Sequence, residues 1–60
     1  MSDANAFLSP GMFVRHPHHP DWGVGQVQSN IGHRVTVMFP EEGKVVIDST
    51  VVLLEPVFDV

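Results

Sequence analysis

Short valine-rich runs, separated by turn-forming residues, constrain the fold of this chain more than any other feature of its sequence. Between positions 12 and 57 the apolar residues come a few at a time, broken by Gly, Pro, Asn and Asp. Eleven of the 60 residues are valine, whose branched side chain favours extended backbone over helix. No stretch between the breaks suits a helix of about three turns, so the pattern predicts an antiparallel all-β meander.

Five strands are expected, at residues 12–16, 22–29, 33–39, 44–48 and 51–55. A chain of 60 residues without cysteine must be held together by a single small core. Closing the meander on itself would bury its apolar side most completely, which predicts a small five-stranded antiparallel SH3-like (Tudor-like) barrel. We expect the barrel at residues 10–57, between a flexible N-terminal tail (1–9) and a C-terminal tail (58–60).

Two glycine-ended loops, at residues 30–32 and 41–43, set the expected strand pairing. Each is typical of a type I turn followed by glycine in the left-handed region. The first loop would place Val27 opposite Val35, and the second would place Val37 opposite Ile47. Both hairpins then turn one apolar side inward. The predicted inner face is Val27, Val35, Val37, Phe39, Val45 and Ile47, with Gly23 and Gly25 leaving room for Phe39.

The same pairing predicts a row of outward apolar side chains across three strands. Such a patch often marks a partner surface. Alternatively, Phe7, Leu8 or Phe58 in the tails would fold over the row and complete the core. The predicted partner-binding residues are Trp22, Val24, Met38 and Val46.

The charge balance disfavours binding through nucleic-acid phosphates. Seven acidic residues oppose three basic ones, for a net charge of −4. A nucleic-acid-binding module remains the alternative hypothesis, with basic side chains scattered around one stacking ring. Its candidate residues are Arg15, Trp22, Arg34 and Lys44.

No apolar run approaches the ~18 residues that span a bilayer, and no basic region followed by a hydrophobic one begins the chain. We therefore expect a cytoplasmic protein that does not enter a membrane.

Three of the four histidines, His16, His18 and His19, fall in one short segment with Asp21. They are weak candidates for a metal site, because adjacent side chains point apart in an extended chain and closed sites usually draw ligands from a second element. We expect neither a metal nor another cofactor.

No arrangement of residues suggests catalysis. The chain has no cysteine, and its serines lack a recognisable nucleophile motif. Glu41 and Glu42 are adjacent, but the tip of a hairpin offers no cleft that could raise the pKa of one of them. The protein is therefore not expected to be an enzyme.

The sequence also carries motifs of a known family. These are Gly11-Met-Phe-Val-Arg-His-Pro, Trp22-Gly-Val-Gly-Gln-Val-Gln-Ser, Val35-Thr-Val-Met-Phe and Gly43-Lys44. Over about residues 10–55 the chain resembles a family of short stand-alone bacterial proteins of unknown function. It is also similar to the Tudor-like C-terminal domain of UvrD-type helicases and to the RNA-polymerase-interacting domain of CarD-type regulators.

The resemblance implies an SH3-like fold that docks on RNA polymerase, partly through a strand edge. The chain departs from those relatives in its Asp21-Trp22 loop, its low positive charge and the lack of an attached helicase or DNA-binding domain. Nearly all positions that match the family serve the scaffold, so the resemblance supports a function only by analogy. The matching positions are Gly11, Val14, His16, Gly23, Gly25, Val27, Val35, Val37, Phe39, Gly43, Lys44 and Leu53.

The leading hypothesis is thus a protein-interaction module that binds RNA polymerase or an associated transcription or repair factor through the apolar row and an open strand edge. The first alternative is nucleic-acid binding. The second is self-association through the same row or edge, which would add burial to a small chain. The sequence leaves the partner, pathway and oligomeric state open.

Overall fold

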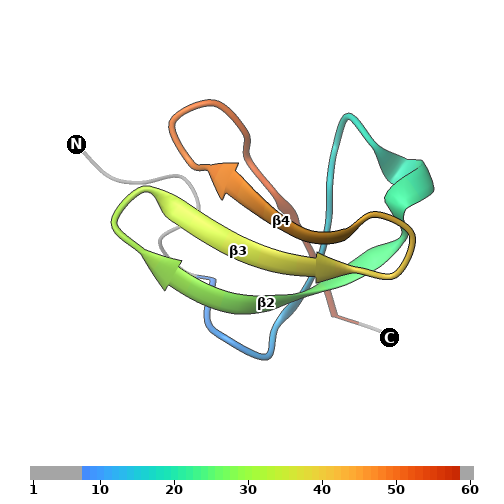
Figure 1. The fold of residues 1–60 in the computed structure, drawn as a ribbon, viewed down its shortest axis with the longest axis horizontal. Coiled ribbons are helices and arrows are strands. Elements are labelled where there is room, and N and C mark those ends of the chain that lie inside the picture. Colours follow the sequence, from blue (N-terminus) through green and yellow to red (C-terminus); the bar gives the residue numbers. More distant parts are fainter. Residues whose placement is uncertain (1–7, 59–60) are drawn as a thin grey trace.

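The structure is a computed structural model that describes residues 8–58. It confirms an all-β chain with five strands (Figure 1). The one remaining regular element in this range is a 3-10 turn, η1, at Pro20–Trp22. The strands are β1 (Phe13–Arg15), β2 (Val24–Ile31), β3 (Arg34–Phe39), β4 (Gly43–Asp48) and β5 (Glu55–Val57).

All strand pairs are antiparallel, and the sheet order is β4-β3-β2-β1-β5. The first four strands follow each other as a meander, and β5 returns beside β1. Figure 1 shows β2, β3 and β4 as a curved unit, with the C-terminal segment crossing behind it. Strands β4 and β5 are the two edges, and no pairing joins them in the described range, so the sheet is not closed.

At the inward valines, both hairpins pair two residues away from the predicted register. Val27 lies opposite Val37 instead of Val35, and Val37 lies opposite Val45 instead of Ile47. A shift of two residues preserves the face on which each side chain lies, because side chains alternate with a period of two. The pairing prediction was therefore wrong, while its division into inner and outer faces survives.

The first error arises at the turn. Strand β2 continues through the predicted loop to Ile31, which pairs with Arg34, so only Gly32 and His33 connect the strands. Gly32 has φ +61°, a left-handed conformation that suits glycine in a short hairpin turn. An extra residue, Gln28, forms a bulge in β2. It shifts the pairing of β2 with β3 by one residue between Val27 and Ser29.

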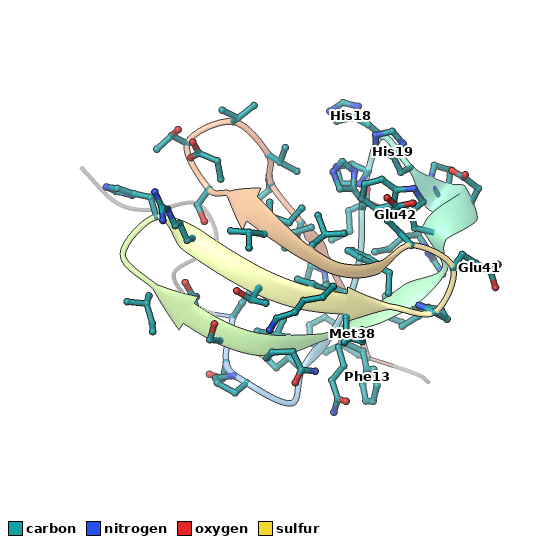
Figure 2. All side chains as sticks on the ribbon, in the orientation of Figure 1. Phe13, His18, His19, Met38, Glu41 and Glu42 are labelled. Carbon is teal, nitrogen blue, oxygen red and sulfur yellow. The ribbon has the colours of Figure 1, made fainter. Side chains whose placement is uncertain are left out.

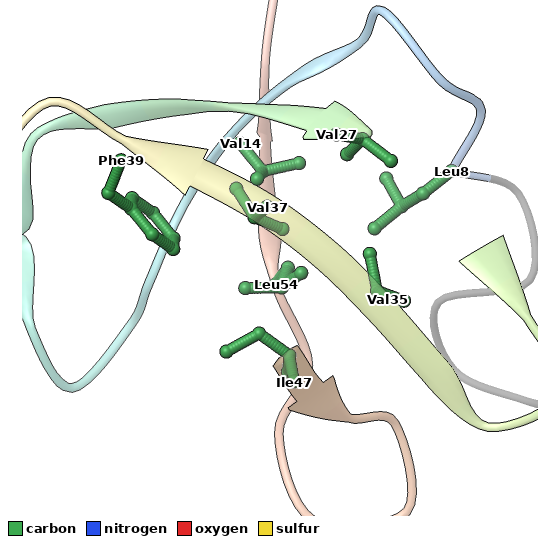
Figure 3. Packing of buried hydrophobic residues seen from close by; sticks show 8 residues of the cluster. All are labelled: Leu8, Val14, Val27, Val35, Val37, Phe39, Ile47 and Leu54. Carbon is green, nitrogen blue, oxygen red and sulfur yellow. The ribbon is translucent and has the colours of Figure 1, made fainter. Parts of the chain in front are cut away.

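The buried core consists of eight apolar side chains on the inner side of the sheet (Figure 3). The predicted inner face is confirmed at five positions, and Val45, the sixth, is partly buried against the same core. The chain segments outside the hairpins supply the remaining members. The core residues are Leu8, Val14, Val27, Val35, Val37, Phe39, Ile47 and Leu54.

The predicted last strand at residues 51–55 is wrong. The N–H groups of Val51 and Val52 both donate to the Asp48 carbonyl at 3.0 Å, so the chain turns as it leaves β4. Leu53, carried over as a scaffold position, is 56% exposed, whereas its neighbour Leu54 is fully buried. Apolar character alone could not distinguish these two leucines.

The N-terminal boundary also moves. Leu8, predicted to lie in a flexible tail, is only 3% exposed, and its carbonyl accepts a hydrogen bond of 2.8 Å from the Asn30 amide. Leu8 therefore completes the inner core and does not cover an outer row. Phe58 is 83% exposed and covers nothing, and Phe7 lies outside the described residues.

Gly25 makes the close packing of β2 and β3 possible. A Cβ at this buried position would lie 2.6 Å from Val37 Cγ1 and 2.7 Å from Phe39 Cδ1. These distances are far below van der Waals contact, so the missing side chain creates the space that the Phe39 ring fills.

We predict that Gly25→Ala lowers the free energy of unfolding by about 1–3 kcal/mol through overpacking. Urea unfolding followed by fluorescence of the single tryptophan measures the change. Adding Phe39→Leu should make the double variant more stable than the sum of the two single changes implies, because the smaller side chain frees space. Wild-type stability of Gly25→Ala, or simple additivity, would contradict this packing.

Candidate functional site

The observed register creates an outward row that crosses all five strands. Gln26 on β2 lies opposite both Phe13 on β1 and Met38 on β3, and the ends of the row are Val57 on β5 and Lys44 on β4. Phe13 is 38% exposed and Met38 is 44% exposed. Figure 2 shows these two side chains projecting near one another. We call this set of five residues the five-strand row.

The predicted row of Val24, Met38 and Val46 is not formed as expected. All three side chains lie on the outer face, but Val24 pairs with Arg15 and Val46 pairs with Thr36. Because the register is shifted by two residues, Gln26 and Lys44 lie opposite Met38 in place of Val24 and Val46. Phe13 was not among the predicted site residues. Its place beside Gln26 depends on the pairing of β1 with β2, which the two glycine-ended loops do not determine.

Trp22 does not lie at the end of an outer row. It belongs to η1, where its N–H donates to the His19 carbonyl at 3.0 Å, and it packs against the core. Its ring centroid is 5.3 Å from that of the inward Phe39. Pro20 begins this turn, so the alternation expected of a strand does not apply to Trp22.

Trp22 instead joins three histidines in an aromatic cluster. The His19 ring stacks on Trp22 with centroids 4.2 Å apart and an interplanar angle of 6°. The His16 ring is edge-on to Trp22 at 4.9 Å, to His19 at 4.7 Å and to His18 at 5.9 Å. The turn at η1 gathers side chains that an extended chain would have kept apart, and Figure 2 shows His18 and His19 beside it.

His16 is the buried member of this cluster, with 6% of its surface exposed. Its Nδ1 accepts a hydrogen bond from the His18 backbone N–H at 3.1 Å, which requires Nδ1 to be unprotonated. Burial, followed by the nearby His19 and His18, lowers the pKa of His16 from its usual value. The structure thus favours the neutral imidazole.

The three histidines that were weak metal candidates are close together, but they do not form a metal centre. Within residues 8–58, no group of three His, Cys, Asp or Glu side chains is placed so that it could hold a metal ion. The Nδ1 atom of His16 is already occupied by the backbone bond from His18. The arrangement is that of ring packing around one buried imidazole.

The basic side chains are not brought together. Arg15 lies between Val24 and Glu55, and Arg34 lies opposite Asp48 at the other end of its hairpin from Lys44. Trp22, the stacking candidate, packs beside the core instead of among them. The predicted nucleic-acid residues therefore form no positive stripe.

The comparisons with known proteins assign a family without a function. A family model described as "Protein of unknown function (DUF3553)" matches residues 8–57. No curated protein and no solved structure matches the chain. Among the described residues, no helix has the length and apolar character needed to cross a membrane.

We predict that acid weakens the fold through His16. A folded-state pKa below the unfolded value of 6.5 means that the unfolded chain binds more protons in that range, so stability falls as pH drops below about 6.5. The melting temperature should decrease from pH 7.5 to pH 5.5, and less so in His16→Asn, whose Oδ1 can still accept the His18 N–H.

Asp48 should not mask this effect. Hydrogen bonds from the Thr50 hydroxyl and N–H hold the pKa of Asp48 below its usual range, so it titrates at more acidic pH. Equal pH slopes for wild type and His16→Asn would contradict the predicted role of His16.

Proposed function

The chain belongs to the DUF3553 family, a family of unknown function, and we propose that it is a non-catalytic protein-interaction module of the bacterial cytoplasm. The observation that carries this proposal is the five-strand row. Its apolar members Phe13, Met38 and Val57 share one continuous line with the polar Gln26 and Lys44. Exposed apolar side chains that share a surface with polar ones are common where one protein binds another.

The chemistry of the row suits a protein partner. Phenylalanine and methionine are enriched in interfaces, and the flexible methionine adapts to the shape of the opposing surface. The Gln26 side chain lies between them; its Nε2 donates to the Gly11 carbonyl at 3.4 Å, and its Oε1 can accept a hydrogen bond from a polar group of the partner. The inner face of the sheet is occupied by the buried core.

We further propose that the fold is an SH3-like (Tudor-like) barrel. The C-terminal strand β5 returns to pair with β1, the strand at the other end of the meander from β4, and gives the curved sheet the five strands of the proposed barrel. The glycine at position 25 allows β2 and β3 to approach closely over Phe39, which supports strong curvature.

The proposed partner is RNA polymerase or a factor bound to it. The proposal follows the resemblance to polymerase-docking Tudor-like domains that the Gly11 to Pro17 and Trp22 to Ser29 motifs suggest. The net charge of −4 and the dispersed basic residues favour a protein surface over nucleic-acid phosphates.

We predict that Phe13→Glu combined with Met38→Glu lowers the affinity for purified bacterial RNA polymerase at least ~10-fold, because two apolar contacts become buried charges. Biolayer interferometry measures the affinity. Ile31→Glu combined with Val51→Glu is the matched control, since both residues are apolar and 76% exposed but lie outside the row. The control should bind as wild type does.

Two outcomes would contradict the proposal. One is equal polymerase binding by wild type and the row variant. The other is binding to single-stranded or duplex DNA that falls steeply with salt and persists in the row variant, which would favour the nucleic-acid alternative.

A further inference from the structure

The two edges of the sheet differ in how they are protected. Edge strand β5 has three residues and contains Pro56, which lacks an N–H and blunts an edge. Edge strand β4 has six residues, from Gly43 to Asp48, and contains neither a proline nor a bulge in its pairing with β3. An unprotected strand of this length is a template for pairing with another strand.

The direction of the backbone groups on β4 follows from one hydrogen bond. The Ser49 N–H donates to the His33 carbonyl at 2.8 Å, which marks this pair as hydrogen-bonded across the β3 and β4 strands. Hydrogen-bonded pairs alternate along an antiparallel ladder, so Ile47 and Val45 also direct their backbone groups toward β3. The N–H and C=O groups of Lys44 and Val46 then point to the free edge.

The outward groups at the centre of β4 have no internal partner in the described part of the chain. The hydrogen bonds outside the ladders include none to Lys44 or Val46. At Asp48 the carbonyl already accepts the N–H groups of Val51 and Val52, so the free edge is available from Lys44 to Val46 and at the Asp48 N–H.

The sequence of β4 is complementary to itself in one antiparallel register. When two copies are paired about Val46, each Lys44 lies opposite Asp48 of the other copy, and each Val45 lies opposite Ile47. Residues 44, 46 and 48 then pair among themselves, so the free N–H groups of Val46 and Asp48 face the carbonyls of Val46 and Lys44 in the other copy. Opposite charges directly across an antiparallel pair are stabilising, and the two Val46 side chains meet at the axis.

We propose that β4 is a homodimerisation edge, at which two copies of this chain pair antiparallel about Val46 into one continuous ten-stranded sheet. The interface is isologous, so every contact occurs twice. In this dimer Lys44 and Asp48 do not repel a second strand, because each lies opposite the residue of opposite charge in the other copy. Neighbouring registers lose this match: pairing about Val45 places Lys44 opposite Val46.

The proposed dimer edge shares Lys44 with the five-strand row but does not require the proposed function. Val46 lies outside the five-strand row, and its side chain is 58% exposed, so it can be changed without opening the core. A chain that dimerises but does not bind RNA polymerase would support the dimer and contradict the proposed function. A chain that binds RNA polymerase but stays monomeric would do the opposite.

The test uses the position of Val46 on the two-fold axis. In Val46→Lys a lysine faces its own copy, and in Val46→Glu a glutamate does so, so each variant alone should dimerise at least ~10-fold more weakly than wild type. A 1:1 mixture of the two variants should form a heterodimer, because lysine then faces glutamate. Sedimentation equilibrium across micromolar to millimolar concentrations measures the three samples.

The control variants are Val51→Lys and Val51→Glu, which place the same charges on an exposed valine beyond the strand and should dimerise as wild type does. A monomeric wild type at millimolar concentration, undiminished dimerisation of either Val46 variant, or a 1:1 mixture that stays monomeric would each overturn the proposal.

A second measurement needs no substitution. Amide hydrogen exchange in the wild type should slow at Val46 and Asp48 as concentration rises, because these N–H groups become bonded only in the dimer. The Val27 N–H, bonded to the Met12 carbonyl at 2.8 Å in each copy, should be unaffected. Concentration-independent exchange at Val46 would contradict the edge pairing.

Discussion

The two-residue alternation of side chains along paired strands is the constraint on which the rest of this structure depends. It commits Val35, Val37 and Phe39 of β3 to the core and the residues between them to the surface. Because β3 pairs on both sides, it transmits this division to β2 and β4. The core, the five-strand row and the free edge of β4 all follow from this single alternation and from the register that accompanies it.

The sequence predicts the faces well because alternation is a local property. The inner positions of the hairpins could be identified from valine spacing alone, whereas the register could not. Whether a hairpin closes at Gly32 over two residues or three depends on the bulge at Gln28, and a bulge carries no clear sequence signal. The consequence is a surface row centred on Gln26 between Phe13 and Met38, in place of one formed by Val24, Met38 and Val46.

Segments outside the hairpins were harder to predict for a different reason. Leu8, Leu54 and Trp22 reach the core from a terminal segment, an irregular segment and a 3-10 turn, where neither alternation nor helical periodicity applies. The histidine cluster has the same origin, since only the turn at η1 brings His16 and His19 against Trp22. A 60-residue domain depends on such contributions, because its hairpins alone enclose a small core.

The two proposed sites of association differ in kind, since the five-strand row would act through side chains and the edge of β4 through backbone. Both depend on the register of β2, β3 and β4, which backbone nuclear Overhauser effects measure directly. Cross-strand contacts should link Gln26 with Met38 and Val37 with Val45. Contacts that link Val27 with Val35 and Val37 with Ile47 would contradict this register, since the five-strand row would then not exist.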